Sequence, residues 1–234
     1  MNTFSDSFGL AGFLITHFDA KLVAIVDLSL RVSLTATIAA SCIGLPLGAA
    51  VAVGRFPGRQ ALIVLLNALM GLPPVVVGLV VYLLLSRAGP LGAFGILFTP
   101  TAMIVAQTIL IVPIVAALSR QIIADAWGEY REQLMSLGAD TFSASLTLLW
   151  DTRFSLLTVV MAGFGRAIAE VGAVMIVGGN IDGVTRVMTT TIALETSKGD
   201  LPLALALGLV LVAVVLVVNA TTQAVRGWAR ARYG

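Results

Sequence analysis

The sequence predicts an all-α integral membrane protein with five transmembrane helices. Hydrophobic residues make up 59% of the 234-residue chain, charged residues only 11%, and the mean hydropathy is +1.03, which excludes an ordinary soluble domain. A spanning helix needs about 20 apolar residues to cross about 30 Å of hydrocarbon. Four runs without Asp, Glu, Lys or Arg exceed that length: Val32–Val53, Ala61–Ser86, Ala88–Ser119 and Leu201–Val225. A fifth run, Phe154–Asn180, is interrupted only by Arg166 and Glu170. No alternating segments typical of a membrane β-barrel occur.

Residues 1–22 are predicted to be an interfacial segment rather than a span. Phe8–Ile15 is apolar, but charged residues from Asp19 to Asp27 interrupt the pattern. A basic n-region and a small-residue cleavage site are both missing, so we do not expect a secretory signal peptide. An amphipathic segment lying in the outer membrane interface fits better.

Each of the first three predicted spans contains glycine or proline residues that bear on its helix geometry. Gly44 and Gly48 are four residues apart in the first, Pro73-Pro74 interrupts the second, and Pro113 lies in the third. Small residues at this spacing let helices approach closely, and proline is tolerated where neighbours satisfy the freed backbone groups. Helix packing with kinks is one interpretation. The other is that proline-bent helices line a pathway that opens and closes.

The distribution of Lys and Arg predicts an external N-terminus and a cytoplasmic C-terminus. The cations assigned to the cytoplasmic side are Arg55, Arg59, Arg120, Arg131, Arg153, Arg226, Arg230 and Arg232. Those assigned to the outer side are Lys21, Arg31, Arg87, Arg186 and Lys198. This excess places the polar stretch 120–153 in the cytoplasm.

That stretch contains Glu132-Gln-Leu-Met-Ser-Leu-Gly138. It resembles the cytoplasmic coupling loop of ABC-importer permeases, whose signature is E-A-A-x-x-x-G followed by nine residues and I-x-L-P. Glu132 and Gly138 keep the spacing, and Leu148 stands at the isoleucine position. Trp150 and Asp151 replace the family's leucine and proline.

The resemblance implies that the coupling region 120–153 docks on an ATPase. Glu129 and Glu132 would anchor it by hydrogen bonds, while Gly138-Ala139-Asp140 would end one helix and begin the next. The alternative is that the stretch is a solvated loop.

Arg166 and Glu170 form the strongest chemical pattern within a span. They are four residues apart, which places them on one helix face, and each charge alone would cost about 2.5–3.5 kcal/mol at the bilayer centre. They are therefore expected to pair or to face a water-filled cavity. In one interpretation they lock the helix bundle. In the other, Arg166 adds positive potential to the pathway of an oxyanion.

The segment after the fifth apolar run contains Asn180, Thr185 and Arg186 among glycines and threonines. Its amide, hydroxyl and guanidinium groups suit an oxyanion at an outer mouth, although a docking surface for a solute-binding protein is an equal alternative. The sequence of this segment resembles the G-N-I-x-G-x-T-R segment of molybdate and tungstate permeases. The continuation T-T-x-I-A-L-E-T-S-K-G-D is most similar to the tungstate branch. A P-P motif in the second span and the G-P-L-G turn at 89–92 support the same group.

The resemblance implies a single permease domain over residues 1–234 of the type I ABC-importer kind, multi-pass in the cytoplasmic membrane. It would work as a homodimer with an ABC ATPase dimer and an extracytoplasmic binding protein, surrounded by membrane lipid and without nucleic acid. No G-x-x-x-x-G-K-[ST] motif occurs, so ATP and Mg are expected on the partner ATPase. Cys42 and His17 are the only residues of their types, so no metal, cofactor or catalytic group is expected on this chain.

Two other classes of function are weaker. A secondary transporter is expected to show inverted repeats, which five unequal spans do not suggest. An integral-membrane enzyme lacks paired intramembrane carboxylates. Sequence alone does not separate tungstate from molybdate, because the two tetrahedral dianions have similar size and charge.

Overall fold

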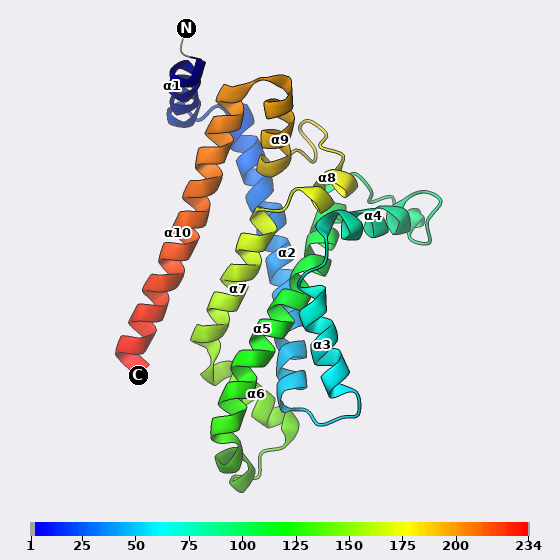
Figure 1. Cartoon of the computed structure of the whole chain (residues 1–234), viewed down its shortest axis with the longest axis vertical. Coiled ribbons are helices and arrows are strands. Elements are labelled where there is room, and N and C mark those ends of the chain that lie inside the picture. The colour runs from blue at the N-terminus through cyan, green and yellow to red at the C-terminus, as the bar shows by residue number, and fades with distance from the viewer. Residues whose placement is uncertain (1–2, 234) are drawn as a thin grey trace. The chain divides into compact units, whose positions relative to one another are not determined.

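The computed structural model describes the backbone of residues 3–233 and the side chains of residues 8–225, 227 and 228. This range is built from helices joined by short connections, and it contains no strand (Figure 1). The helices are α1 (Thr3–Thr16), α2 (Ala20–Val53), α3 (Arg59–Leu69), α4 (Pro74–Leu85), η1 (Gly92–Phe94), α5 (Pro100–Ser136), α6 (Thr141–Asp151), α7 (Arg153–Ile168), α8 (Gly172–Gly178), α9 (Met188–Lys198) and α10 (Leu201–Tyr233). The predicted all-α fold is confirmed.

The apolar helices give between three and five membrane spans within the described residues. Three helices, α2, α5 and α10, are individually long and apolar enough. Two bent pairs qualify only if each pair counts as one span: α3 with α4, at 101°, and α6 with α7, at 77°. The count of five therefore stays a prediction.

The first long helix begins earlier than the sequence pattern indicated. The charges from Asp19 to Asp27 interrupt the apolar pattern, but they do not interrupt the helix, because α2 runs from Ala20 through Asp27 to Val53. Asp19 caps its start by accepting from the N–H groups of Lys21 and Leu22, both at 3.0 Å. Asp27 and Arg31 form an exposed ion pair of 2.9 Å one helical turn apart, so these charges need not leave the helix.

The predicted second span is divided into α3 and α4 by its proline pair. Pro73 is extended, with φ −64° and ψ 121°, and Pro74 occupies the first turn of α4. A residue that precedes proline is pushed away from helical geometry, whereas proline itself suits a helix start. The double proline therefore begins α4, while α3 has already ended at Leu69 and Leu72 is kept from helical geometry.

The predicted third span, Ala88–Ser119, differs at both of its ends. Its first twelve residues, 88–99, form turns and η1, and α5 begins only at Pro100. It then continues past the predicted end to Ser136, so that the first part of the coupling region 120–153 is helical.

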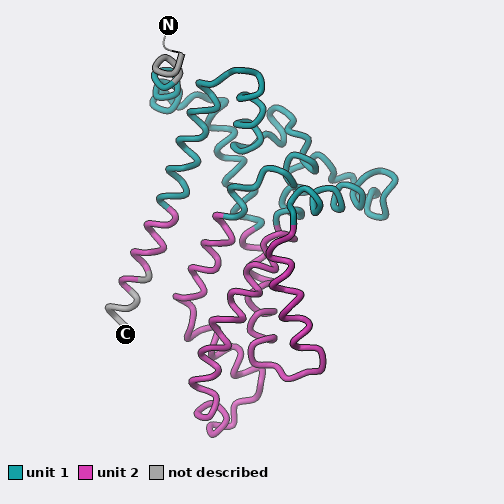
Figure 2. The backbone as a smooth tube through the Cα atoms, viewed as in Figure 1, with its two compact units in different colours: residues 1–36, 73–107, 166–217 teal, residues 37–72, 108–165, 218–234 magenta. Residues whose placement is uncertain are grey.

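The chain folds into two compact units (Figure 2). Unit 1 comprises residues 1–36, 73–107 and 166–217, and unit 2 comprises residues 37–72, 108–165 and 218–234. The candidate coupling residues lie in unit 2, whereas Arg166, Glu170 and the outer-mouth residues lie in unit 1. The assignment of residues 1–234 to one functional domain stays a prediction.

In unit 2, α2 and α5 cross closely at two glycines. A Cβ on Gly48 would lie 2.1 Å from Ser119 Oγ, and one on Gly44 would lie 2.9 Å from the Val115 side chain. Atoms larger than hydrogen cannot fit there, so the packing interpretation of this glycine pair is confirmed. On α7, by contrast, Gly163 faces Ile111 at 3.0 Å, whereas Gly165 faces open space.

Unit 1 contains a similar crossing between α4 and α8. A Cβ on Gly78 would lie 2.7 Å from Ala173 Cα, and one on Gly172 would lie 2.8 Å from the Val75 side chain. Each helix thus contributes a glycine where the other comes closest. This contact fixes the short helix α8 against α4.

Candidate functional site

The coupling turn after α5 has the geometry that Glu132–Gly138 predicted. Gly138 adopts φ +76°. Its N–H donates to Met135 O at 3.1 Å, and the Ala139 N–H donates to Leu134 O at 3.0 Å. This pair of bonds is the Schellman arrangement, in which a left-handed glycine satisfies the last carbonyls of a helix. The prediction that Gly138 ends one helix is confirmed.

Asp140 begins the next helix. Its Oδ1 accepts from the Ser143 N–H at 3.1 Å, which satisfies one of the unpaired N–H groups at the start of α6. Hydrogen bonds from Ser143 lower the pKa of Asp140. The carboxylate is therefore charged at neutral pH and lies at the positive end of the α6 dipole.

Helix α6 has one buried and one exposed apolar face. Ala144 and Leu148 are buried in the unit 2 core. Phe142, Leu146 and Trp150 point outward and are 70%, 52% and 71% exposed. A short amphipathic helix normally turns its apolar side inward, so a second apolar face indicates that something else covers it.

The other proposed coupling residues lie in the last turns of α5 and in the turn that precedes α6. Glu129 and Glu132 are exposed near the end of α5, and Ala139 is half-buried in the turn. Leu137, in the same turn, is 82% exposed and adds to the apolar surface. The ATPase-docking role of these residues stays a prediction.

The corner between α6 and α7 is held by an arginine that the sequence reasoning missed. Arg153 Nη1 donates to Trp150 O at 2.7 Å. The guanidinium carbon lies 4.7 Å from the ring centroid of Trp150 and 4.6 Å from that of Phe154. Arg153 therefore joins the last turn of α6 to the first turn of α7 by a hydrogen bond and two cation–π contacts. The position of Arg153 in the sequence, between Trp150 and Phe154, was the signal that could have predicted these contacts.

In unit 1, the predicted pair forms, but not on one continuous helix. Arg166 Nη1 donates to Glu170 Oε2. Helix α7 ends at Ile168 and α8 begins at Gly172, so Glu170 lies in the break between them. The expectation of one unbroken helix across Phe154–Asn180 is wrong.

The contacts of Glu170 explain why the break is tolerated. Its Oε1 accepts from the Ala173 N–H at 3.1 Å, and its backbone carbonyl accepts from the Thr189 hydroxyl at 2.7 Å. These bonds satisfy backbone groups that a break in a membrane helix would otherwise leave unpaired. The Glu170 side chain is 3% exposed and that of Arg166 is 33% exposed. The pair thus reaches from the interior of unit 1 to its surface.

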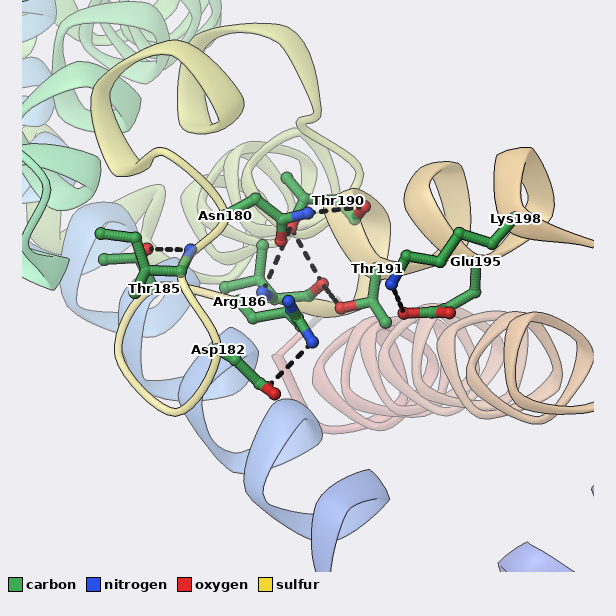
Figure 3. A network of polar contacts seen from close by, with 10 residues as sticks. Asn180, Asp182, Thr185, Arg186, Thr190, Thr191, Glu195 and Lys198 are labelled. Atoms are coloured by element: carbon green, nitrogen blue, oxygen red, sulfur yellow. Dashed lines mark hydrogen bonds and ion pairs between the residues drawn. The ribbon is translucent and has the colours of Figure 1, made fainter. Parts of the chain in front are cut away.

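The outer-mouth residues Asn180 and Thr185 bond mainly to their own segment (Figure 3). Asn180 adopts φ +50°, and its Oδ1 accepts from the Thr190 hydroxyl at 2.9 Å. The Thr185 hydroxyl accepts from the Ile181 N–H at 2.9 Å and donates to Gly178 O at 2.5 Å. These side chains hold the segment in shape, and Thr185 is only 1% exposed.

Arg186 lines a pocket of about 640 Å³ between the start of α2 and the loop after α8. Its Nη1 forms an ion pair of 2.9 Å with Asp182, and the pocket is also lined by Lys21 and Asp27. The lining thus contains both cations and carboxylates, and Asp27 is also paired with Arg31, so the pocket is of mixed charge rather than a cluster of cations. An outer-mouth role for Asn180, Thr185 and Arg186 stays a prediction.

Comparison with known proteins shows similarity over nearly the whole chain, although no family model matches it. The chain is 41% identical to the "Tungstate uptake system permease protein TupB" of Peptoclostridium acidaminophilum, over 94% of this chain and 96% of that protein. It is 42% identical to a "Probable anion ABC transporter permease protein" of Haloferax volcanii, over 85% and 88%. It is 37% identical to the TupB protein of Campylobacter jejuni, over 93% and 91%.

Proposed function

Because the chain belongs to the ABC-transporter permease family that includes the tungstate uptake permeases, we propose that it is the membrane subunit of a tungstate importer. ATP hydrolysis on a separate subunit drives the transport. The chain is thus a permease and not itself an enzyme. The observation that carries the proposal is the identity of 41% across 96% of a tungstate permease, which leaves no large part of that protein unmatched.

The structure of α6 supports the coupling step of this function. The exposed side chains of Phe142, Leu146 and Trp150 form a compact apolar surface beside a sharply capped turn. An ATPase groove that receives this helix would move α6 when the ATP-bound dimer closes. Because Arg153 ties α6 to α7, that movement reaches the membrane helices.

The complete importer contains two copies of this permease, an ABC ATPase dimer that binds ATP and Mg, and an extracytoplasmic binding protein. It lies in the cytoplasmic membrane, in contact with lipid. The mixed charges around Arg186 are suited to transient passage or to protein docking, because tight anion retention would slow release. Selection of tungstate therefore belongs mainly to the binding protein, with which the outer segment 177–191 makes contact.

We expect the permease, reconstituted in proteoliposomes with its ATPase and binding protein, to accumulate tungstate only when ATP is present. Molybdate should compete according to its affinity for the binding protein, measured in parallel by isothermal titration. A matched control contains the same vesicles with an ATPase that binds but does not hydrolyse ATP. Accumulation that proceeds without ATP hydrolysis would reject the ABC-importer function.

Cysteine labelling in intact cells tests the orientation of the chain. In a background in which the exposed Cys42 is replaced by alanine, Ser136→Cys should react only with reagents that enter the cytoplasm. Val184→Cys should react from outside. Val184 is 46% exposed, whereas the neighbouring Thr185 is too buried to report. Labelling of both positions from the same side would contradict the topology.

A further inference from the structure

A small cavity in unit 1 lies where α7 ends, among segments of α2, α5 and α9. The room that it leaves for the centre of a water molecule is about 10 Å³, which is at the lower limit of the roughly 10–15 Å³ that one water needs. Its polar lining residues are Ser29, Ser33, Gln107, Glu170 and Thr189.

One side-chain oxygen in the described wall lacks a hydrogen-bond donor. Gln107 is 3% exposed, and its Nε2 donates to Ala167 O at 3.0 Å. Its Oε1 is buried and has no partner. Rotating the amide would place Oε1 against the Ala167 carbonyl, oxygen to oxygen, so this orientation is required. A buried acceptor without a donor is unfavourable, and the cavity beside it is the place from which a donor can come.

The hydroxyl groups of Ser29 and Thr189 in the wall cannot supply that donor. The Ser29 hydroxyl donates to Ile25 O at 2.7 Å and accepts from the Met188 N–H at 2.7 Å. The Thr189 hydroxyl donates to Glu170 O at 2.7 Å. The hydrogen of each hydroxyl is therefore already engaged, and each oxygen can only accept a further hydrogen bond. Because these oxygens are acceptors, a molecule or ion bound in the cavity must be a small hydrogen-bond donor or a small cation.

Charge balance favours a neutral donor over a cation. The carboxylate of Glu170 is already compensated by Arg166 and also accepts from the Ala173 N–H. A sodium ion would add a second positive charge without a matching carboxylate, which is unfavourable in a medium of low dielectric constant. A water molecule adds no charge and donates two hydrogen bonds.

We propose that the cavity holds one ordered water molecule, which donates to Gln107 Oε1 and to a second oxygen in the wall. Through this water, α5 is linked to the break between α7 and α8. Gln107 would thus hold the end of α7 both directly, through Nε2, and indirectly, through Oε1. The proposal is independent of which anion the permease carries.

A structure of the wild-type transporter complex at a resolution that shows ordered waters tests this directly. We expect one density peak in the cavity, about 2.6–3.2 Å from Gln107 Oε1. An empty cavity would overturn the proposal. A peak bound by several oxygens at distances shorter than hydrogen bonds would also overturn it, in favour of a cation. Equal melting temperatures in sodium chloride and choline chloride are expected, and stabilisation specific to sodium would likewise contradict a water.

A pair of substitutions provides a second test in solution. Val32→Ile adds a methylene group to the cavity wall and should displace the water, which leaves Oε1 unpaired and lowers the melting temperature by about 2–4 °C. In a Gln107→Met background Oε1 is absent and cannot be left unpaired, so the same change should lower the melting temperature less. Val174→Ile, buried in the same unit but outside the cavity, is the control and should behave alike in both backgrounds. Equal effects of Val32→Ile in both backgrounds would reject the water.

Discussion

Replacing Arg166 with leucine is expected to destabilise the permease by about 3–5 kcal/mol, because it leaves the buried carboxylate of Glu170 without its cation. Glu170→Leu should be milder, since the remaining Arg166 is 33% exposed and can be hydrated. It still removes the acceptor for the Ala173 N–H, at about 1–3 kcal/mol. Thermal unfolding of the purified complexes would measure both losses.

The double substitution Arg166→Leu with Glu170→Leu separates the two interpretations of this pair. A structural ion pair predicts that expression, stability and much of the uptake return, short of full recovery because Ala173 remains uncapped. If Arg166 instead attracts the anion, the double variant should fold but stay inactive, while Glu170→Gln alone should keep or raise uptake. We expect the first outcome. A stable, inactive double variant would contradict it.

Gly138→Val is expected to reduce ATP-dependent uptake by about tenfold or more while the permease remains inserted. The turn requires φ +76°, and a β-branched residue adopts such a value only at a cost of about 1–2 kcal/mol or more. Because no other atoms crowd Gly138, the effect arises from backbone conformation alone. Uptake and ATPase co-purification would be measured together.

Gly138→Asn is the matched control for this turn, since asparagine tolerates left-handed geometry better than other residues with a side chain. It should retain most of the uptake that Gly138→Val loses. Normal uptake and normal ATPase co-purification in Gly138→Val would remove the coupling turn from the mechanism.

The coupling turn could be predicted because its signals are local. A glycine that ends a helix and an aspartate that caps the next lie within a few residues of each other, at Gly138 and Asp140, and their hydrogen bonds stay within that segment. The membrane class was predictable for a similar reason, since long uncharged runs depend on composition alone.

The helix breaks were harder to predict because they depend on distant partners. The end of α7 at Ile168 is tolerated because Thr189, nineteen residues beyond Glu170, donates to the Glu170 carbonyl. Nothing near Glu170 in the sequence signals that bond. The prediction that Arg166 and Glu170 pair was therefore correct, but its reason, that both lie on one helix face, was not, because Glu170 lies beyond the end of α7.

The arginine at the α6–α7 corner has a mechanical consequence. Proline, which the family signature places at the position of Asp151, restricts a chain through the covalent geometry of its ring. In this chain, hydrogen bonds and aromatic faces around Arg153 hold the corner instead. Because none of these contacts is covalent, they fix the angle between α6 and α7 less rigidly than a proline ring would. In the proposed importer, the fraction of α6 movement that reaches α7 would therefore depend on the contacts of this one side chain.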